Sequence, residues 1–178
     1  MLLDLTHIRQ AETDLVRAFE PAVFAGRDDA FRTASTVDLS VRIHKDQDRF
    51  RLVGTVAATL ELRCGRCLEP FAWPVEAAFD VRYLPQSANA GDEEREIDED
   101  DLSTSFYRDE QIDLGQLIEE QFYLALPMKP LCRADCRGLC PQCGTDWNVE
   151  TCACDEKWED PRLAGLKALI IERKKDDA

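Results

Sequence analysis

The sequence contains no apolar run of the ~18 residues that a membrane-spanning helix requires. Its first residues also lack the basic segment and the long apolar core of a secretory signal, so no export signal is visible. These two absences predict a cytoplasmic protein with no membrane partner. In such a reducing compartment, cysteines serve as metal ligands or reactive thiols more often than as disulfides.

Positive charge is also scarce. The chain has 22 lysines and arginines against 36 aspartates and glutamates, which gives a net charge of −14. Because nucleic-acid affinity comes mainly from cationic contacts to phosphates, RNA binding by this chain would have to be local or assisted by another protein. The acidic excess lies in residues 1–128, whereas residues 129–178 are close to neutral.

Groups for catalysis are few. The only two histidines, His7 and His44, lie on an N-terminal segment and beside a polar turn, where surface positions are expected. The chain has no Ser/His/Asp set, phosphate-binding loop or dinucleotide-binding fingerprint. Its carboxylates gather in one solvated-looking stretch, which makes a poor preorganised acid–base site. We therefore expect a non-enzymatic protein without a small-molecule substrate.

Residues 33–84 show the period-two alternation of antiparallel strands with one wet face. Three such runs are present, and a polar turn at residues 45–48 separates the first two. Their expected core positions are Val37, Leu39, Val41 and Ile43; Phe50, Leu52, Val56, Ala58, Leu60 and Leu62; and Val75, Ala77, Phe79, Val81 and Tyr83.

The segments outside these runs are interpreted from residues that typically cap or end helices. Thr6 could cap a helix that has Ile8, Leu15 and Phe19 on one face and ends at Pro21. Residues 85–111 read as a mobile insert, with eight acidic residues between Asp92 and Asp101. This insert is interpreted as a disordered loop, or alternatively as a surface that mimics nucleic acid or docks on a basic ribosomal protein.

A helix is predicted near residues 113–126. Asp113 resembles an N-cap, and Gln116 completes a capping-box pattern. Pro127 ends the helix. A shorter helix is expected to start at Asp160-Pro161. Its apolar stripe would comprise Leu163, Leu166 and Ile170.

These elements predict an α+β fold: an antiparallel β-sheet with one long helix and a cysteine-rich, zinc-clamped C-terminal module. We expect two domains. Residues 1–128 would form a mainly antiparallel β domain, with the acidic insert near 85–111 and the helix near 113–126. Residues 129–178 would form the cysteine-rich zinc module with a short C-terminal helix.

The eight cysteines are the most informative feature, because eight thiols divide into two sets of four. Cys-x2-Cys pairs suit zinc, since a tight turn aims both thiolates at one tetrahedral ion. Gly65 and Gly144 supply backbone freedom for such turns. Proximity in sequence groups Cys140, Cys143, Cys152 and Cys154. By elimination, the other group is Cys64, Cys67, Cys132 and Cys136.

Several alternatives stay open at this stage. One site could mix Cys132 or Cys136 with the late pair, and four cysteines can also ligate an iron–sulfur cluster. The Cys64-Gly65-Arg66-Cys67 stretch could be a thiol redox motif of an oxidoreductase. Sites closed by four thiolates are structural, whereas catalytic zinc keeps one position open for water. Two structural zinc ions are the expected cofactors.

Basic residues lie among these cysteines. Arg66, Arg133 and Arg137 are expected to offset the negative charge of the sites and to donate hydrogen bonds to sulfur. Alternatively, they contact RNA together with Lys129. Trp147 could stack on a base, although such an aromatic more often packs a zinc knuckle.

The stretch Cys64-Gly65-Arg66-Cys67-Leu68-Glu69-Pro70-Phe71 resembles the hallmark of the large ribosomal RNA subunit accumulation protein family. The stretch from Asp113 to Cys154 is also similar, through its Gly138-Leu139-Cys140-Pro141-Gln142-Cys143-Gly144 core. Asp160-Pro161-Arg162-Leu163 matches the closing helix of the family.

The resemblance implies a bacterial or plastid protein needed for normal accumulation of 23S ribosomal RNA. We therefore expect a factor in large-subunit RNA processing or ribosome assembly. Its partner would be 23S rRNA or its precursor, or a large-subunit ribosomal protein. A zinc-stapled protein–protein adaptor that acts on rRNA indirectly is the alternative.

Overall fold

A computed structural model describes residues 1–24, 30–88, 103–154 and 162. The chain divides into two compact units. The first comprises Met1–Cys64 and Glu69–Cys132, and the second comprises Gly65–Leu68 and Arg133–Ala178. The division at residues 128 and 129 stays a prediction, since spatial grouping joins the short Gly65–Leu68 turn to the second unit.

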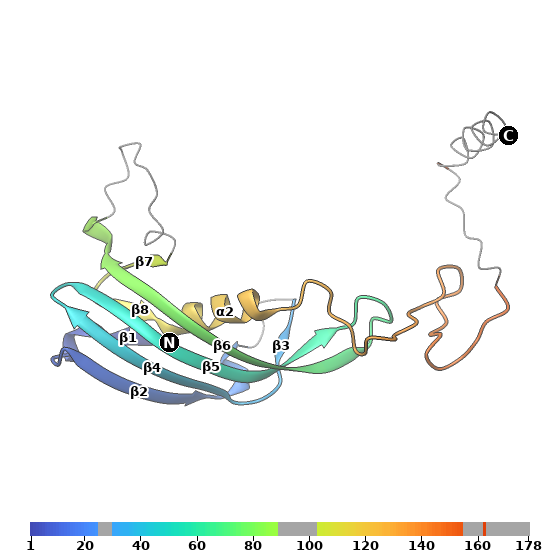
Figure 1. Cartoon of the computed structure of the whole chain (residues 1–178), viewed down its shortest axis with the longest axis horizontal. Helices are drawn as coiled ribbons and strands as arrows, with labels where there is room; N and C mark the ends of the chain where they lie inside the picture. The colour runs from blue at the N-terminus through green and yellow to red at the C-terminus, as the bar shows by residue number, and fades with distance from the viewer. Residues whose placement is uncertain (25–29, 89–102, 155–161, 163–178) are drawn as a thin grey trace, which may run out of the picture. The chain divides into compact units, whose positions relative to one another are not determined.

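The described residues of the first unit form strands, three 3-10 turns and one α-helix (Figure 1). The strands are β1 (Leu2–Asp4), β2 (Glu12–Phe19), β3 (Arg32–Thr33), β4 (Val37–Asp46), β5 (Arg49–Arg63), β6 (Pro70–Pro85), β7 (Thr104–Tyr107) and β8 (Gln111–Asp113). The 3-10 turns are η1 (Leu5–His7), η2 (Pro21–Phe24) and η3 (Gln86–Ala88), and the α-helix is α2 (Leu114–Ala125). Among the described residues, no helix is both long and apolar enough to cross a membrane.

The main sheet runs in the order β2-β4-β5-β6-β7, with β3 paired to β5, and β1 pairs with β8 in a separate ribbon. All pairings are antiparallel except that of β6 with β7. The predicted alternation is confirmed most clearly in β4, where every second side chain from Val37 to Ile43 is buried. Together with the helix, this mixed sheet confirms the predicted α+β class.

The predicted N-terminal helix is wrong. After the short turn η1, Glu12–Phe19 form strand β2, in which Leu15 pairs with Val41 and Phe19 with Val37. Leu15 and Phe19 are four positions apart, and residues at that spacing share one face in a helix and also in a strand. The apolar pattern was therefore ambiguous, and pairing with β4 decides the conformation.

Part of the range 85–111, which was predicted as a mobile insert, forms secondary structure. Thr104–Tyr107 form β7, which pairs in parallel with the end of β6. Tyr107 is buried edge-on against Phe50, and its hydroxyl donates to the Asp48 carbonyl at 3.1 Å. The acidic run from Asp92 to Asp101 lies outside the described residues, as does the helix predicted to start at Asp160-Pro161.

Helix α2 lies against the sheet, contacts β6 and supplies much of the core (Figure 1). Asp113 is the predicted N-cap, and its carboxylate accepts from the Gly115 amide at 2.8 Å. The Asp113 carboxylate also accepts from the Gln116 backbone amide. The side-chain amide of Gln116 donates to Glu120 at 2.9 Å. Leu126, just before Pro127, is extended and ends the helix as predicted.

Gly54 on β5 leaves no room for a side chain beside β4. A Cβ atom at this position would collide with the Ser40 carbonyl oxygen and lie 2.8 Å from Val41 Cα. Because both obstacles are backbone, relief requires the strands to shift. Gly54→Ala should therefore lower the free energy of unfolding by about 1–3 kcal/mol in a urea titration. Thr55→Ala, on the exposed face, should change it by less than about 0.5 kcal/mol; equal effects would contradict this packing.

Candidate metal centres

The eight cysteines form two groups, within each of which the sulfur atoms all lie within 4.8 Å of one another. The first tetrad comprises Cys64, Cys67, Cys132 and Cys136. The second tetrad comprises Cys140, Cys143, Cys152 and Cys154.

Local backbone geometry shapes the two pairs of the first tetrad. Cys64 and Cys67 lie in the connection between β5 and β6, where the Cys64 amide donates to the Glu69 carbonyl at 3.0 Å. Leu68 has a φ of 63°, which turns the chain back toward β6. A second turn, closed by the Cys136 amide and the Arg133 carbonyl at 3.2 Å, carries the later pair.

A tight knuckle carries the first pair of the second tetrad. The Gly144 amide donates to the Cys140 carbonyl at 2.9 Å, and the Cys140 amide donates to the Thr145 carbonyl at 2.8 Å. Gly144 has a φ of 76°, a left-handed conformation that glycine adopts without strain. The turn thus brings Cys140 and Cys143 to the same side, as their spacing predicts.

The donor sets fit a single tetrahedral ion at each tetrad. Four sulfurs at ~2.3 Å from one ion lie about 3.8 Å apart, so separations within 4.8 Å need only a small contraction. Four thiolates would complete a tetrahedral shell around such an ion and leave no position for water. Cys64, Cys67, Cys136 and Cys140 are buried, whereas Cys143 is exposed. Both tetrads could therefore hold metal in a structural manner.

Hydrogen bonds shift the pKa values of three thiols in the second tetrad. Those from Thr145 lower the pKa of Cys143 to about 6. The hydrogen bond with Cys143 raises the pKa of Cys154 to about 12. The indole N–H of Trp147 lowers the pKa of Cys152. Because one thiolate disfavours ionisation of its neighbour, a bound cation would favour the thiolate forms of these three residues.

Two consecutive residues donate hydrogen bonds to sulfur. Trp147 Nε1 donates to Cys152 Sγ at 3.3 Å, and Asn148 Nδ2 donates to Cys136 Sγ at 3.4 Å. The half-buried Trp147 thus contacts the second tetrad through its indole N–H. Asn148 was not predicted, and its position inside the cysteine-rich segment was the only available signal.

The basic residues differ in their contacts. The Arg66 guanidinium donates to the Cys136 carbonyl at 2.7 Å, and Arg133 Nη2 donates to Asn148 Oδ1 at 2.7 Å. Arg66 therefore supports the backbone at Cys136, and Arg133 supports the side chain of Asn148. Arg137 is exposed and contributes its backbone amide to Asn148. Lys129, also exposed, belongs to the first unit.

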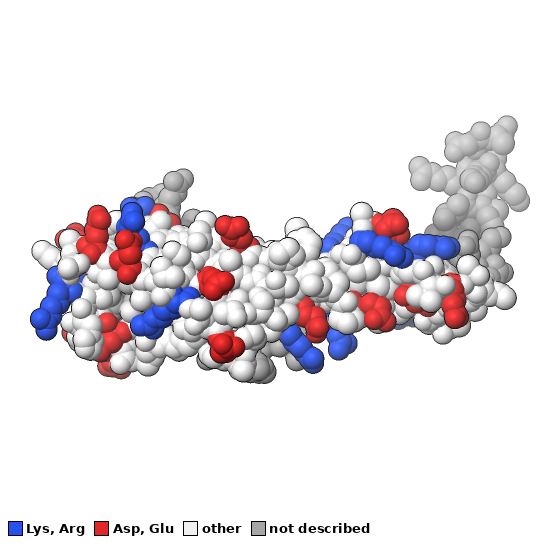
Figure 2. Space-filling view, turned by 90° about the horizontal axis from the view of Figure 1, so that it is seen from below, with Lys and Arg blue, Asp and Glu red and all other residues white. Residues whose placement is uncertain are grey.

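Charge over the sheet is mixed. Figure 2 shows Lys and Arg side chains lying singly among Asp and Glu side chains over the strands. Arg42 Nε pairs with Asp14 at 2.8 Å, and Arg51 Nε pairs with Asp80 at 2.8 Å. The hydrogen bond from Arg51 lowers the pKa of Asp80. On the face shown, the described strands present no broad basic surface for nucleic acid.

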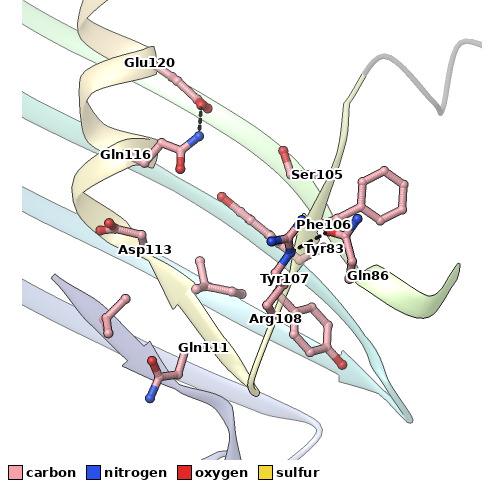
Figure 3. A pocket seen from close by; sticks show the side chains of 12 residues that line it. Tyr83, Gln86, Ser105, Phe106, Tyr107, Arg108, Gln111, Asp113, Gln116 and Glu120 are labelled. Carbon is pink, nitrogen blue, oxygen red and sulfur yellow. Dashed lines mark hydrogen bonds between the residues drawn. The ribbon is translucent and has the colours of Figure 1, made fainter. Parts of the chain in front are cut away.

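A cavity of about 450 Å³ lies beside α2, β7 and β8 in the first unit (Figure 3). Two pairs of its polar side chains are hydrogen-bonded: Gln116 donates to Glu120 at 2.9 Å, and Arg108 donates to Gln86 at 3.3 Å.

Comparisons with known proteins identify relatives in bacteria and plants. An uncharacterized protein of Mycobacterium tuberculosis is 37% identical over 142 residues, which cover 79% of this chain and 65% of the relative. A chloroplastic protein of Zea mays, named as a homolog of the large ribosomal RNA subunit accumulation protein, is 30% identical and covers 74% of this chain and 51% of its own length. The chain thus spans between about half and two thirds of these relatives.

An uncharacterized protein of Bacillus subtilis is 28% identical over 69% of this chain and 66% of its own length. No solved structure matches the chain. The model of the family described as large ribosomal RNA subunit accumulation protein YceD matches residues 52–170. This match covers both knuckles and confirms the resemblance inferred from their motifs. The chain belongs to the YceD family of large ribosomal RNA subunit accumulation proteins.

Proposed function

We propose that this protein is a non-enzymatic factor that supports accumulation of 23S ribosomal RNA and assembly of the large ribosomal subunit. The family match over residues 52–170 is the observation that carries this proposal. The name of the maize relative points to the same process. The proposal places the protein in the cytoplasm of a bacterium, where thiols stay reduced.

Two structural zinc ions belong to this proposal, one held by each tetrad. Zinc favours four tetrahedral thiolates and needs no open position in a structural site. An iron–sulfur cluster of four irons holds its cysteine sulfurs farther apart than one ion does. Sulfur separations within 4.8 Å therefore favour a single ion at each tetrad.

The thiol oxidoreductase alternative receives less support. It requires an exposed, low-pKa thiolate in the Cys64–Cys67 motif. Cys64 and Cys67 are instead 0% and 4% exposed, and their sulfurs lie within 4.8 Å of those of Cys132 and Cys136. A buried thiol held in this way is poorly placed to attack an incoming disulfide.

Arg137 is the best-supported contact to RNA or a ribosomal protein. Of the candidates Arg66, Lys129, Arg133, Arg137 and Trp147, three have side chains engaged in the second unit: Arg66, Arg133 and Trp147. Arg137 uses only its backbone for Asn148, and its side chain is exposed. Lys129 is the second exposed cation, in the first unit.

The adaptor alternative is favoured by charge. With a net charge of −14, the chain repels phosphates as a whole and would attract a basic ribosomal protein. Direct RNA binding therefore depends on local cations such as Arg137, whereas the adaptor does not.

Ultraviolet cross-linking in cells, followed by sequencing of the recovered RNA, separates these functions. We expect enrichment at a defined site of the 23S precursor and a several-fold loss of recovery for Arg137→Glu. Arg17→Glu is the matched control, because it makes the same charge change at an exposed position on β2. Recovery no better than that of an unrelated acidic protein would reject direct binding in favour of the adaptor.

A further inference from the structure

The Trp147-Asn148 dipeptide touches both tetrads. The Trp147 indole donates to Cys152 of the second tetrad, and the Asn148 amide donates to Cys136 of the first, at 3.3 and 3.4 Å between nitrogen and sulfur. Hydrogen bonds of this kind strengthen when the sulfur is a thiolate, because the acceptor is then charged. Two adjacent residues thus contact sulfur atoms of two different candidate metal sites.

The orientation of the Asn148 amide is fixed by its surroundings. Its Oδ1 accepts from Arg133 Nη2 at 2.7 Å and from the Arg137 amide at 2.8 Å. Its Nδ2 donates to Asp146 Oδ1 at 2.6 Å as well as to Cys136. If the amide were flipped, its N–H groups would face the N–H donors of Arg133 and Arg137, and its oxygen would face the Asp146 carboxylate. Only the observed orientation therefore satisfies every partner.

The backbone holds this dipeptide beside the knuckle. Leu139 and Asp146 form an isolated antiparallel bridge, and the Trp147 amide donates to the Gly138 carbonyl at 3.0 Å. The dipeptide lies between Cys143 and Cys152, which both belong to the second tetrad. A metal ion bound there would fix both ends of this loop and restrict where Asn148 can lie.

We propose that Trp147 and Asn148 couple the two metal sites, so that loading of the second tetrad raises the metal affinity of the first. This inference rests on the proposed metal binding. With the second tetrad empty, the loop must lose conformational entropy before Asn148 can contact Cys136, and this loss opposes the contact. With it filled, that ordering is already complete, and the amide stabilises the Cys136 thiolate. By linkage, loading of the first tetrad raises the affinity of the second equally.

The test is a zinc titration of the full chain against a competing chelator. Disabling the second tetrad with Cys143→Ser and Cys154→Ser should weaken zinc binding at the first tetrad about 10–100-fold. In an Asn148→Ala background, the first tetrad should already bind that weakly, and disabling the second should change little further. Unchanged affinity of the first tetrad after loss of the second would overturn the coupling.

Asn148→Asp separates donation to sulfur from a merely structural role. Aspartate keeps an oxygen for Arg133 and Arg137 but loses the N–H that points at Cys136. If donation to sulfur matters, affinity at the first tetrad should fall at least as far as in Asn148→Ala. If aspartate restores wild-type affinity, the amide only braces the loop, and the proposal is wrong.

Cadmium-113 NMR supplies a readout that does not depend on affinity. Each loaded tetrad should give one resonance, and Asn148→Ala should move that of the first tetrad. Val149→Ala is the matched control: Val149 is the next residue, is 79% exposed, and should move neither resonance. Equal shifts in both variants would contradict the assigned contact. If the wild-type chain binds no metal, both the zinc proposal and the coupling proposal are wrong. If it binds two ions independently, only the coupling proposal is wrong.

Discussion

Replacing Cys140 with serine should reduce the bound metal from two ions to one under excess zinc and unfold residues 140–154, while the first tetrad and the β-sheet stay folded. Cys140 is 4% exposed and belongs to the second tetrad, so its loss opens that site at a buried position. The segment around it has few apolar core residues of its own, and bound metal supplies folding free energy in such modules. Metal analysis and amide hydrogen exchange would measure the two effects separately.

Thr151→Ala is the control for this experiment. Thr151 is exposed and lies next to Cys152 in the same segment, but it is not in either tetrad. This variant should keep both ions and the protection of the second unit. Retention of two ions by Cys140→Ser would refute the grouping of Cys140 with Cys143, Cys152 and Cys154. Loss of exchange protection throughout β4 to β6 would show that the sheet does not fold without that metal.

Phe122→Ala should lower the free energy of unfolding of the first unit by about 3–5 kcal/mol. Phe122 is fully buried on α2, and its ring lies 6.3 Å from that of Phe24 and 5.9 Å from that of Phe31. Truncation would leave a cavity between the helix and these two rings, which lie between β2 and β3 in the sequence. Urea denaturation monitored by circular dichroism would measure the loss.

Leu124→Ala tests whether the effect comes from burial. Leu124 lies two residues further along α2 and is 80% exposed. Its truncation should change the free energy of unfolding by less than about 0.5 kcal/mol, since helix propensity hardly differs between leucine and alanine. A comparable loss in both variants would mean that Leu124 is covered in solution.

The central strands could be predicted because burial of one face imposes period two over a long stretch. In β4 and β5, side chains from Val37 to Leu62 alternate in and out with few exceptions. The edge strand β2 could not be predicted in the same way, since Leu15 and Phe19 suit a helix as well as a strand. Strand β7 was hidden because it is short and pairs in parallel with β6, which leaves no hairpin signal.

The cysteines of the candidate sites could be named from spacing alone, because close pairs with glycine at the turn have few other uses. The hydrogen bonds that support these cysteines could not be predicted from the sequence. Asn148 is hydrogen-bonded to Cys136, Arg133 and Arg137. These residues precede it by more than a helical turn, and only the fold brings them near it. The two tetrads agree with the grouping inferred from sequence proximity, while coordination of metal by them stays a prediction.

The Gly65–Leu68 turn groups with Arg133–Ala178, although the strands on either side of it belong to the first unit. Its Arg66 accepts from the Leu139 amide through its carbonyl and donates to the Cys136 carbonyl through its guanidinium. Gly138, with a φ of 77°, leaves room for Arg66, whose carbonyl oxygen would lie 3.1 Å from an added Cβ. The cysteine-rich segment is therefore not a portable zinc finger. A fragment starting at Arg133 would lack the Gly65–Leu68 turn, which belongs to the same unit. A gene fusion or a truncation must therefore keep β5, this turn and β6 together with the C-terminal segment.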